Sequence, residues 1–171
     1  MAAVVVAVFA GVVIAYAVAQ NRGSGDAVPG VRSYTGLSRN HVTGTVHYPQ
    51  TPPVGGDHAA TPQTCGVYTA AVPNENAVHS LEHGAVWLTY RPGLTADQVA
   101  KLAALVKGND HRMLSPYPGQ PAPVMATVWS EQLSVSDAGD ARLRRFVARY
   151  TEGPQDPEPG AACRGVGTPT G

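Results

Sequence analysis

Residues 79 to 90 read His79-Ser80-Leu81-Glu82-His83-Gly84-Ala85-Val86-Trp87-Leu88-Thr89-Tyr90, and this stretch decides the fold. From Ala85 to Tyr90, apolar, β-branched and aromatic residues dominate, which is the strongest strand pattern in the chain. A short helix is expected immediately before this strand, capped by Asn74 or Asn76 and ended by Gly84. His83 is therefore predicted at the junction of a helix and a buried strand, where a side chain is held rigidly.

Two histidines of this stretch have the spacing of a metal-binding pair. His79 and His83 are four residues apart, so on a helix both imidazoles project from one face and could bind one ion. Glu82 could be a third ligand, a hydrogen-bond acceptor for a ligand, or a general base. The pattern His-x-x-Glu-His also occurs in the inverted zincin peptidases, where the glutamate activates water. The alternative is a helix end that carries solvated histidines.

Histidines earlier in the chain favour the metal-binding interpretation. The run Thr51-Pro52-Pro53-Val54-Gly55-Gly56-Asp57-His58 has two prolines and two glycines, so it forms neither a helix nor a central strand. We expect such a turn to present His58 at a defined position. We therefore predict that His58, His79 and His83 converge on one metal ion, with His41 as a fourth candidate ligand.

The composition indicates one domain of ordinary size with many loops. The chain has 171 residues, of which 19 are glycine and 15 are proline, a larger share than usual. Twelve Lys and Arg residues balance twelve Asp and Glu residues, so no overall field attracts nucleic acid. We expect function to lie on loops that a small scaffold holds in place.

The N-terminal segment indicates export. Residues 2–19 are apolar and contain neither a charge nor a proline. As a helix they would rise about 27 Å, close to the roughly 30 Å hydrocarbon core of a bilayer. We expect residues 1–20 to be a single transmembrane anchor, and the alternative is a secretory signal that is cleaved after Ala17-Val18-Ala19. The rest of the chain is predicted to lie outside the cytoplasm, tethered to the cell membrane or secreted.

The remaining chain divides into three parts. Residues 21–39 are polar and contain glycine, which is typical of a linker. Residues 40–153 form the predicted globular domain, and residues 154–171 form a Pro/Gly-rich tail. Cys65 and Cys163 are the only cysteines, and outside the cytoplasm we expect them to form a disulfide that ties the tail back. The alternative role of Cys65 is a thiolate metal ligand.

The order of the predicted elements gives an α+β fold. Strands are expected at residues 41–48, 64–72, 85–90, 112–115 and 124–129. One helix is expected after Thr95, which forms a capping box with Gln98. A last helix, capped by Ser134 with Asp137, buries one apolar face and exposes a solvated arginine stripe. We predict a small mixed or antiparallel sheet with the helices packed on one face.

Several ordered motifs resemble those of one bacterial family. They are His41-Val42-x-Gly44, Pro52-Pro53-x-x-Gly56-x-His58, Cys65-Gly66-Val67-Tyr68, Val78-His79-Ser80-Leu81-Glu82-His83-Gly84-Ala85-Val86, Ser115-Pro116-Tyr117-Pro118 and Pro157-Glu158-Pro159-Gly160-Ala161-x-Cys163. Over about residues 38–165 the chain resembles the family known as domain of unknown function 3105.

This resemblance implies one membrane-spanning segment followed by an exported domain, a plan that is common in actinobacteria. The histidines that fall on the family's motifs are His41, His58, His79 and His83. The other two histidines, His47 and His111, do not fall on these motifs. The family has no assigned activity, so the resemblance defines a candidate site without a function.

Three classes of function agree with the sequence. The first is a membrane-tethered protein that binds copper or zinc outside the cytoplasm, where Met113 or Met125 could add a thioether if neither lies in the core. The second is a non-catalytic structural or assembly protein with a partner in an envelope complex. The third is a zinc-dependent hydrolase in which Glu82 is the catalytic base. We expect a metal-binding protein rather than an enzyme.

Overall fold

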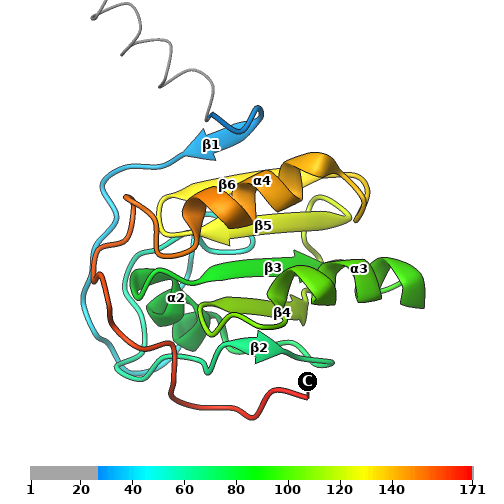
Figure 1. The fold of residues 1–171 in the computed structure, drawn as a ribbon. Helices are drawn as coiled ribbons and strands as arrows, with labels where there is room; N and C mark the ends of the chain where they lie inside the picture. The colour runs from blue at the N-terminus through cyan, green and yellow to red at the C-terminus, as the bar shows by residue number, and fades with distance from the viewer. Residues whose placement is uncertain (1–26, 171) are drawn as a thin grey trace, which may run out of the picture.

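The computed structural model describes residues 27–170, whose strands form one mixed sheet (Figure 1). The strands are β1 (Val31–Ser33), β2 (Gly66–Val67), β3 (Val86–Tyr90), β4 (Arg112–Pro116), β5 (Val124–Val128) and β6 (Glu131–Val135). Their order across the sheet is β1-β6-β5-β3-β4-β2. β4 runs parallel to β2 and β3, whereas the other neighbouring pairs are antiparallel. The predicted α+β class with a mixed sheet is therefore confirmed.

Helices cover both faces of this sheet. α3 (Ala96–Val106) and α4 (Ala141–Tyr150) pack on one face, and α2 (Asn74–Glu82) packs on the other. Successive side chains of a strand point to opposite faces, so Leu88 lies in the core beneath α3 and α4, while Trp87 lies in the core beneath α2. The prediction that the helices share one face is wrong, because β3 is apolar on both sides and each side needs a cover.

The stretch from residue 41 to residue 72 contains much less strand than its alternating pattern predicts. Residues 42–48 are irregular, and His41 makes only an isolated bridge with His58. Of residues 64–72, only β2 joins the sheet, at its edge beside β4. The backbone finds other partners, as where the Val46 N–H donates to the Glu75 carboxylate at 2.9 Å. Such local bonds satisfy the backbone without a ladder of strands.

The hairpin of β5 and β6 explains why the last helix begins later than predicted. β6 includes Ser134, which therefore cannot cap a helix. α4 begins instead after Asp140, whose carboxylate accepts from the Arg142 N–H at 2.9 Å. α3 begins as predicted, because Thr95 and Gln98 form the expected capping box.

α2 begins without the predicted asparagine cap. Its first residue, Asn74, follows Pro73, and no side chain bonds to the free N–H groups of the first turn. The Asn76 amide donates instead to the Thr61 carbonyl at 2.7 Å, so it fastens the preceding loop to the helix. Asparagine suits both a helix start and a loop contact, which is why the sequence alone did not separate the two.

The two ends of the chain differ from the predicted division. Residues 31–33, expected within the linker, form β1 and pair antiparallel with β6, because the edge of β6 offers free backbone groups. The predicted transmembrane segment, residues 1–20, lies outside the described residues. Between residues 27 and 170, no helix combines the length and the apolar character that crossing a membrane requires.

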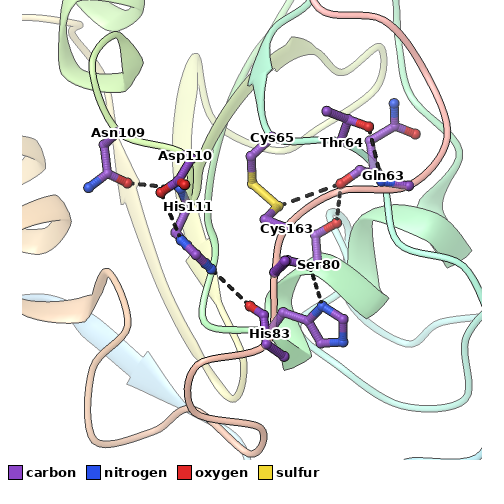
Figure 2. Close-up of a disulfide and its surroundings, with 12 residues drawn as sticks. Gln63, Thr64, Cys65, Ser80, His83, Asn109, Asp110, His111 and Cys163 are labelled. Carbon is purple, nitrogen blue, oxygen red and sulfur yellow. Dashed lines mark hydrogen bonds and ion pairs between the residues drawn. A yellow bond between two sulfur atoms is a disulfide. The ribbon is translucent and has the colours of Figure 1, made fainter.

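The predicted disulfide is present. Cys65 and Cys163 are 98 residues apart in the sequence, and their Cα atoms are 5.5 Å apart in the bonded pair (Figure 2). The Cys65 N–H also donates to the Cys163 carbonyl at 3.0 Å. Because both sulfur atoms are bonded, Cys65 does not have the free thiolate that its alternative role as a metal ligand needs.

Replacing Asp140 with alanine should destabilise the fold, because α4 loses its capping carboxylate and the ion pair of that carboxylate with Arg142. The expected loss is about 1 kcal/mol of unfolding free energy, measured by urea denaturation. Ser134→Ala is the matched control, since Ser134 is exposed on β6 and its loss should change stability by less than about 0.5 kcal/mol. Equal losses for the two variants would contradict the cap assignment.

Candidate metal centre

The C-terminus of α2 positions two of the predicted site residues. His79 lies in the last turn, and His83 is the residue at which the helix ends. The Gly84 N–H donates to the Leu81 carbonyl and the next N–H donates to the Ser80 carbonyl, the two bonds of a Schellman motif. Gly84 has a φ of +80°, which glycine adopts without strain. The helix therefore stops at one defined residue.

The turn before His58 holds this residue against the end of α2. Gly55 has a φ of +142°, and a Cβ atom there would lie 2.8 Å from Leu37 and 3.2 Å from Trp129. The His58 N–H donates to the Asn40 carbonyl at 3.0 Å, which brings the start of the domain alongside. The Pro/Gly run thus presents His58 at a defined position, as its composition predicts.

Four side chains from three chain segments meet at this place. One ligand atom from each of His41, His58, His79 and Glu82 lies within 4.8 Å of those of the other three. The ring centroids of the first three are 4.8 to 5.0 Å apart. His83 is not in this group of four, but its Nε2 lies 2.9 Å from the His79 Nε2. The structure therefore brings the predicted residues together and places His83 beside the cluster.

Backbone carbonyls determine which nitrogen of three rings carries the proton. A carbonyl oxygen only accepts, so the ring nitrogen beside it must donate. These bonds are His58 Nδ1–H to Gly56 at 2.8 Å, His79 Nδ1–H to Ala59 at 2.6 Å and His83 Nδ1–H to Ala162 at 2.9 Å. Each neutral ring is left with a lone pair on Nε2. Histidines that bind metals are commonly held in this way.

The lone pair of His58 faces a carboxylate in the interior. The His58 side chain is 0% exposed, and its Nε2 lies 2.9 Å from the Glu82 Oε2. In the neutral ring Nδ1 holds the proton, so Nε2 has none to donate to this oxygen. Two electron-rich atoms at this distance repel each other. A positive charge between them, from a proton or a metal ion, removes the repulsion.

Glu82 is a buried carboxylate with partners on both oxygens. Its side chain is 2% exposed, and the Arg39 Nε–H donates to Oε1 at 2.6 Å. The hydrogen bond with Glu82 raises the pKa of Arg39 above the usual value of an arginine. Oε2 faces His58 and lies 4.0 Å from the His41 Nε2. Arg39 thus compensates the buried charge while one oxygen stays directed at the histidines.

The ring of His79 is held in the form that binds a metal. Burial lowers the pKa of His79, and the bond to the Ala59 carbonyl opposes this effect. The nearby rings of His83, His58 and His41 lower the pKa further. A lowered pKa favours the neutral imidazole. The His79 Nε2 lies 2.9 Å from the His83 Nε2, so this contact, like that of His58 with Glu82, needs a proton or a metal ion between the two atoms.

The four ligand atoms lie within 4.8 Å of one another, so some pairs must move closer before they could hold a small ion. With bonds of 2.0 to 2.1 Å, the ligand atoms of a tetrahedral site are roughly 3.3 Å apart. The measured contacts of Glu82 Oε2, 2.9 Å to His58 and 4.0 Å to His41, lie on either side of this value. Movements of about an ångström, within the range of side-chain torsions, would complete the site.

Two further charged residues of the site were not predicted from the sequence. Arg39 was assigned to the linker, and Glu158 to the tail. Glu158 lies 3.4 Å from the His83 Nε2 and accepts from Arg39 at 3.2 Å. Two weak features of the sequence indicated them. Arg39 is two residues before His41, and Glu158 lies within one of the family motifs.

The other two histidines lie outside the cluster. His47 is exposed in the irregular stretch. His111, just before β4, contacts the Asp110 carboxylate and the Ala161 carbonyl. Both outcomes agree with the resemblance, which placed neither residue on a family motif.

The fold and this cluster define an α+β domain with an imidazole–carboxylate site at the end of a helix. A family model described as "Protein of unknown function (DUF3105)" matches residues 41–165, and the chain belongs to this family. The resemblance seen in the ordered motifs is therefore confirmed. Comparisons with curated proteins and with solved structures give no match.

Replacing Gly84 with alanine should disrupt the end of α2. A Cβ atom at this position would collide with the Asp156 carboxylate and lie 3.1 Å from the Glu152 Cα. Gly108 is a matched control, because its φ of +81° is nearly the same and nothing lies within 4 Å of its Cβ position. We expect Gly108→Ala to cost about 1 kcal/mol of unfolding free energy and Gly84→Ala at least about 2 kcal/mol. Equal costs in urea denaturation would show that Asp156 simply moves aside.

Proposed function

We propose that this chain is a membrane-tethered protein that binds copper or zinc outside the cytoplasm through its histidine cluster. The observation that carries the proposal is the cluster itself, in which one ligand atom from each of His41, His58, His79 and Glu82 lies within 4.8 Å of the others and the buried His58 Nε2 is 2.9 Å from the Glu82 carboxylate. A metal ion at this point accepts the lone pair and compensates the carboxylate in one step. His41 and His79 complete the set of donors.

The donor set favours Zn(II) or Cu(II) over Cu(I). Three imidazoles and one carboxylate suit these divalent ions, whereas Cu(I) prefers sulfur. Met113 and Met125, the candidate thioether ligands, are 0% and 2% exposed and belong to the strands β4 and β5.

The location outside the cytoplasm rests on two features. Residues 2–19 have the composition of a membrane anchor or an export signal. The disulfide of Cys65 and Cys163 is typical of an oxidising compartment. Both features support export, and the anchor adds a tether to the membrane.

A zinc-dependent hydrolase has less support. A catalytic base needs a free oxygen directed at the water that it activates. Arg39 occupies Oε1 of Glu82, and His58 approaches Oε2. This arrangement suits a ligand, or a residue that orients ligands, better than a base.

The proposal predicts one metal ion per full-length chain purified without a polyhistidine tag. His58→Ala should weaken zinc binding by more than about 100-fold, because it removes a buried ligand. His47→Ala is the matched control, since this exposed histidine lies outside the cluster. Metal content is measured by elemental analysis and affinity by competition with a chromophoric chelator. A wild-type chain that binds neither zinc nor copper would refute the proposal.

The variant Glu82→Gln distinguishes a metal-binding protein from a zinc-dependent hydrolase. For a binder, the amide should lower metal affinity by about 10- to 100-fold, because a negative group next to the ligands is lost. Peptide and ester hydrolysis should be absent in both the wild type and the variant. A metal-dependent hydrolysis that disappears in the variant while the metal content stays unchanged would establish the enzyme instead.

A further inference from the structure

A short segment of the tail closes one side of the cluster. Residues 158–163, called the strap below, run past the end of α2. The Glu158 carboxylate lies 3.4 Å from the His83 Nε2 and accepts from the Arg39 guanidinium at 3.2 Å. The Ala162 carbonyl accepts the Nδ1–H of His83 at 2.9 Å. The strap therefore orients the His83 ring and supplies a carboxylate beside it.

The disulfide attaches the strap covalently to the body of the domain. Within the described part of the tail, residues 154–170, Cys163 alone is buried. The other attachments are hydrogen bonds, including the one that the Ala161 carbonyl accepts from the His111 Nε2 at 2.9 Å. Bonds of this kind are readily replaced by bonds to water. Backbone bonds between Cys65 and Cys163, and between Val166 and both Pro62 and Thr64, hold the adjoining chain in place as well. Among these attachments, the disulfide is the one that water cannot replace.

A cavity opens onto the same disulfide. Its volume is 380 Å³, and its lining residues are Thr64, Cys65, Asp110, Cys163, Arg164 and Gly165. Cys65 is half-buried, whereas Cys163 is buried, so Cys65 is the more exposed residue of the pair. Asp110 and Arg164 give its walls one charge of each sign, which suits a small polar thiol.

We propose that this cavity is a thiol-exchange site, and that a dithiol reductant acting there releases the strap and weakens metal binding at the cluster. This inference rests on the metal-binding function proposed above. It assigns to the disulfide a regulatory role in addition to its role in holding the tail.

The exchange is balanced as a two-electron reduction. One thiolate of the dithiol attacks the Cys65 Sγ, the S–S bond breaks, and Cys163 leaves as a thiolate that takes a proton. The second thiol of the reductant then displaces the Cys65 sulfur, giving two protein thiols and a cyclic disulfide of the reductant. The Cys163 sulfur lies 3.5 Å from the Gln63 carbonyl (Figure 2), which can accept the new S–H.

Release of the strap acts on the cluster through His83. Without the Ala162 carbonyl and Glu158, this ring loses the bond that orients it and its neighbouring carboxylate. The His79 Nε2, 2.9 Å away, then loses an ordered imidazole beside it. Losing contacts that orient metal ligands typically lowers affinity about 10- to 100-fold.

The test compares the oxidised and reduced forms of the full-length chain. The protein is treated with dithiothreitol, desalted under argon and capped with iodoacetamide, so that neither the reductant nor the new thiols can bind metal. The control receives iodoacetamide without reductant. We expect zinc affinity to fall about 10- to 100-fold on reduction while the far-ultraviolet circular dichroism stays the same. The reduction rate should rise in proportion to the dithiothreitol concentration.

Several results would overturn the inference. Equal zinc affinity of the two forms would show that the strap does not act on the cluster. Unfolding on reduction would show that the disulfide only braces the fold. A reduction rate that saturates at high dithiothreitol would mean that opening of the fold, rather than the cavity, gives access. If the oxidised chain binds no zinc at all, the proposed function itself fails, and the regulatory role fails with it.

Glu158→Gln provides a second test that leaves the disulfide intact. We expect about a 10-fold loss of zinc affinity in the oxidised form and a smaller further loss on reduction than in the wild type. Glu152→Gln is the matched control, because Glu152 is also half-exposed and its nearest histidine is His111, outside the cluster. Unchanged affinity of Glu158→Gln, or equal losses in the two variants, would contradict the role of the strap.

Discussion

The arrangement around α2 depends on one buried carboxylate, Glu82. A buried charge costs several kcal/mol unless other groups compensate it. Arg39, 43 residues earlier in the chain, donates to one oxygen at 2.6 Å, and His58 lies against the other. Three segments far apart in the sequence must therefore meet at the end of one short helix. This requirement explains why the loops between residues 39 and 58 are held in place without forming strands.

The sheet provides the rigid base that these loops need. β3 follows α2 directly, and its side chains enter both cores of the domain. A site that is attached to such an element is positioned more accurately than a site on loops alone. His79 and Glu82 are fixed through α2, whereas His41 and His58 are paired with each other by an isolated bridge, and the Ala59 carbonyl that follows accepts from the His79 ring. The cluster is therefore built partly on loops, and these loops lie against the best-packed part of the fold.

Local patterns predicted the parts of the structure that local interactions determine. β3, the capping box of α3 and the histidine pair of α2 depend on residues within about one helical turn of each other. β1 and β6 could not be predicted in this way, because β1 exists only where β6 supplies a partner. The same holds for Arg39 and Glu158, which join the site through contacts over 43 and 119 residues. A single sequence does not show which distant charge compensates Glu82.

The disulfide and the proposed ion restrain the same irregular part of the molecule. In the chain-entropy model, a link across 98 residues stabilises the folded state by on the order of 4 to 5 kcal/mol. An ion that binds only the folded cluster adds about 2.7 kcal/mol when its concentration is 100 times its dissociation constant. Together these terms approach the total stability of many small domains. A chain with both restraints can therefore keep residues 39–65 and its tail largely free of regular structure.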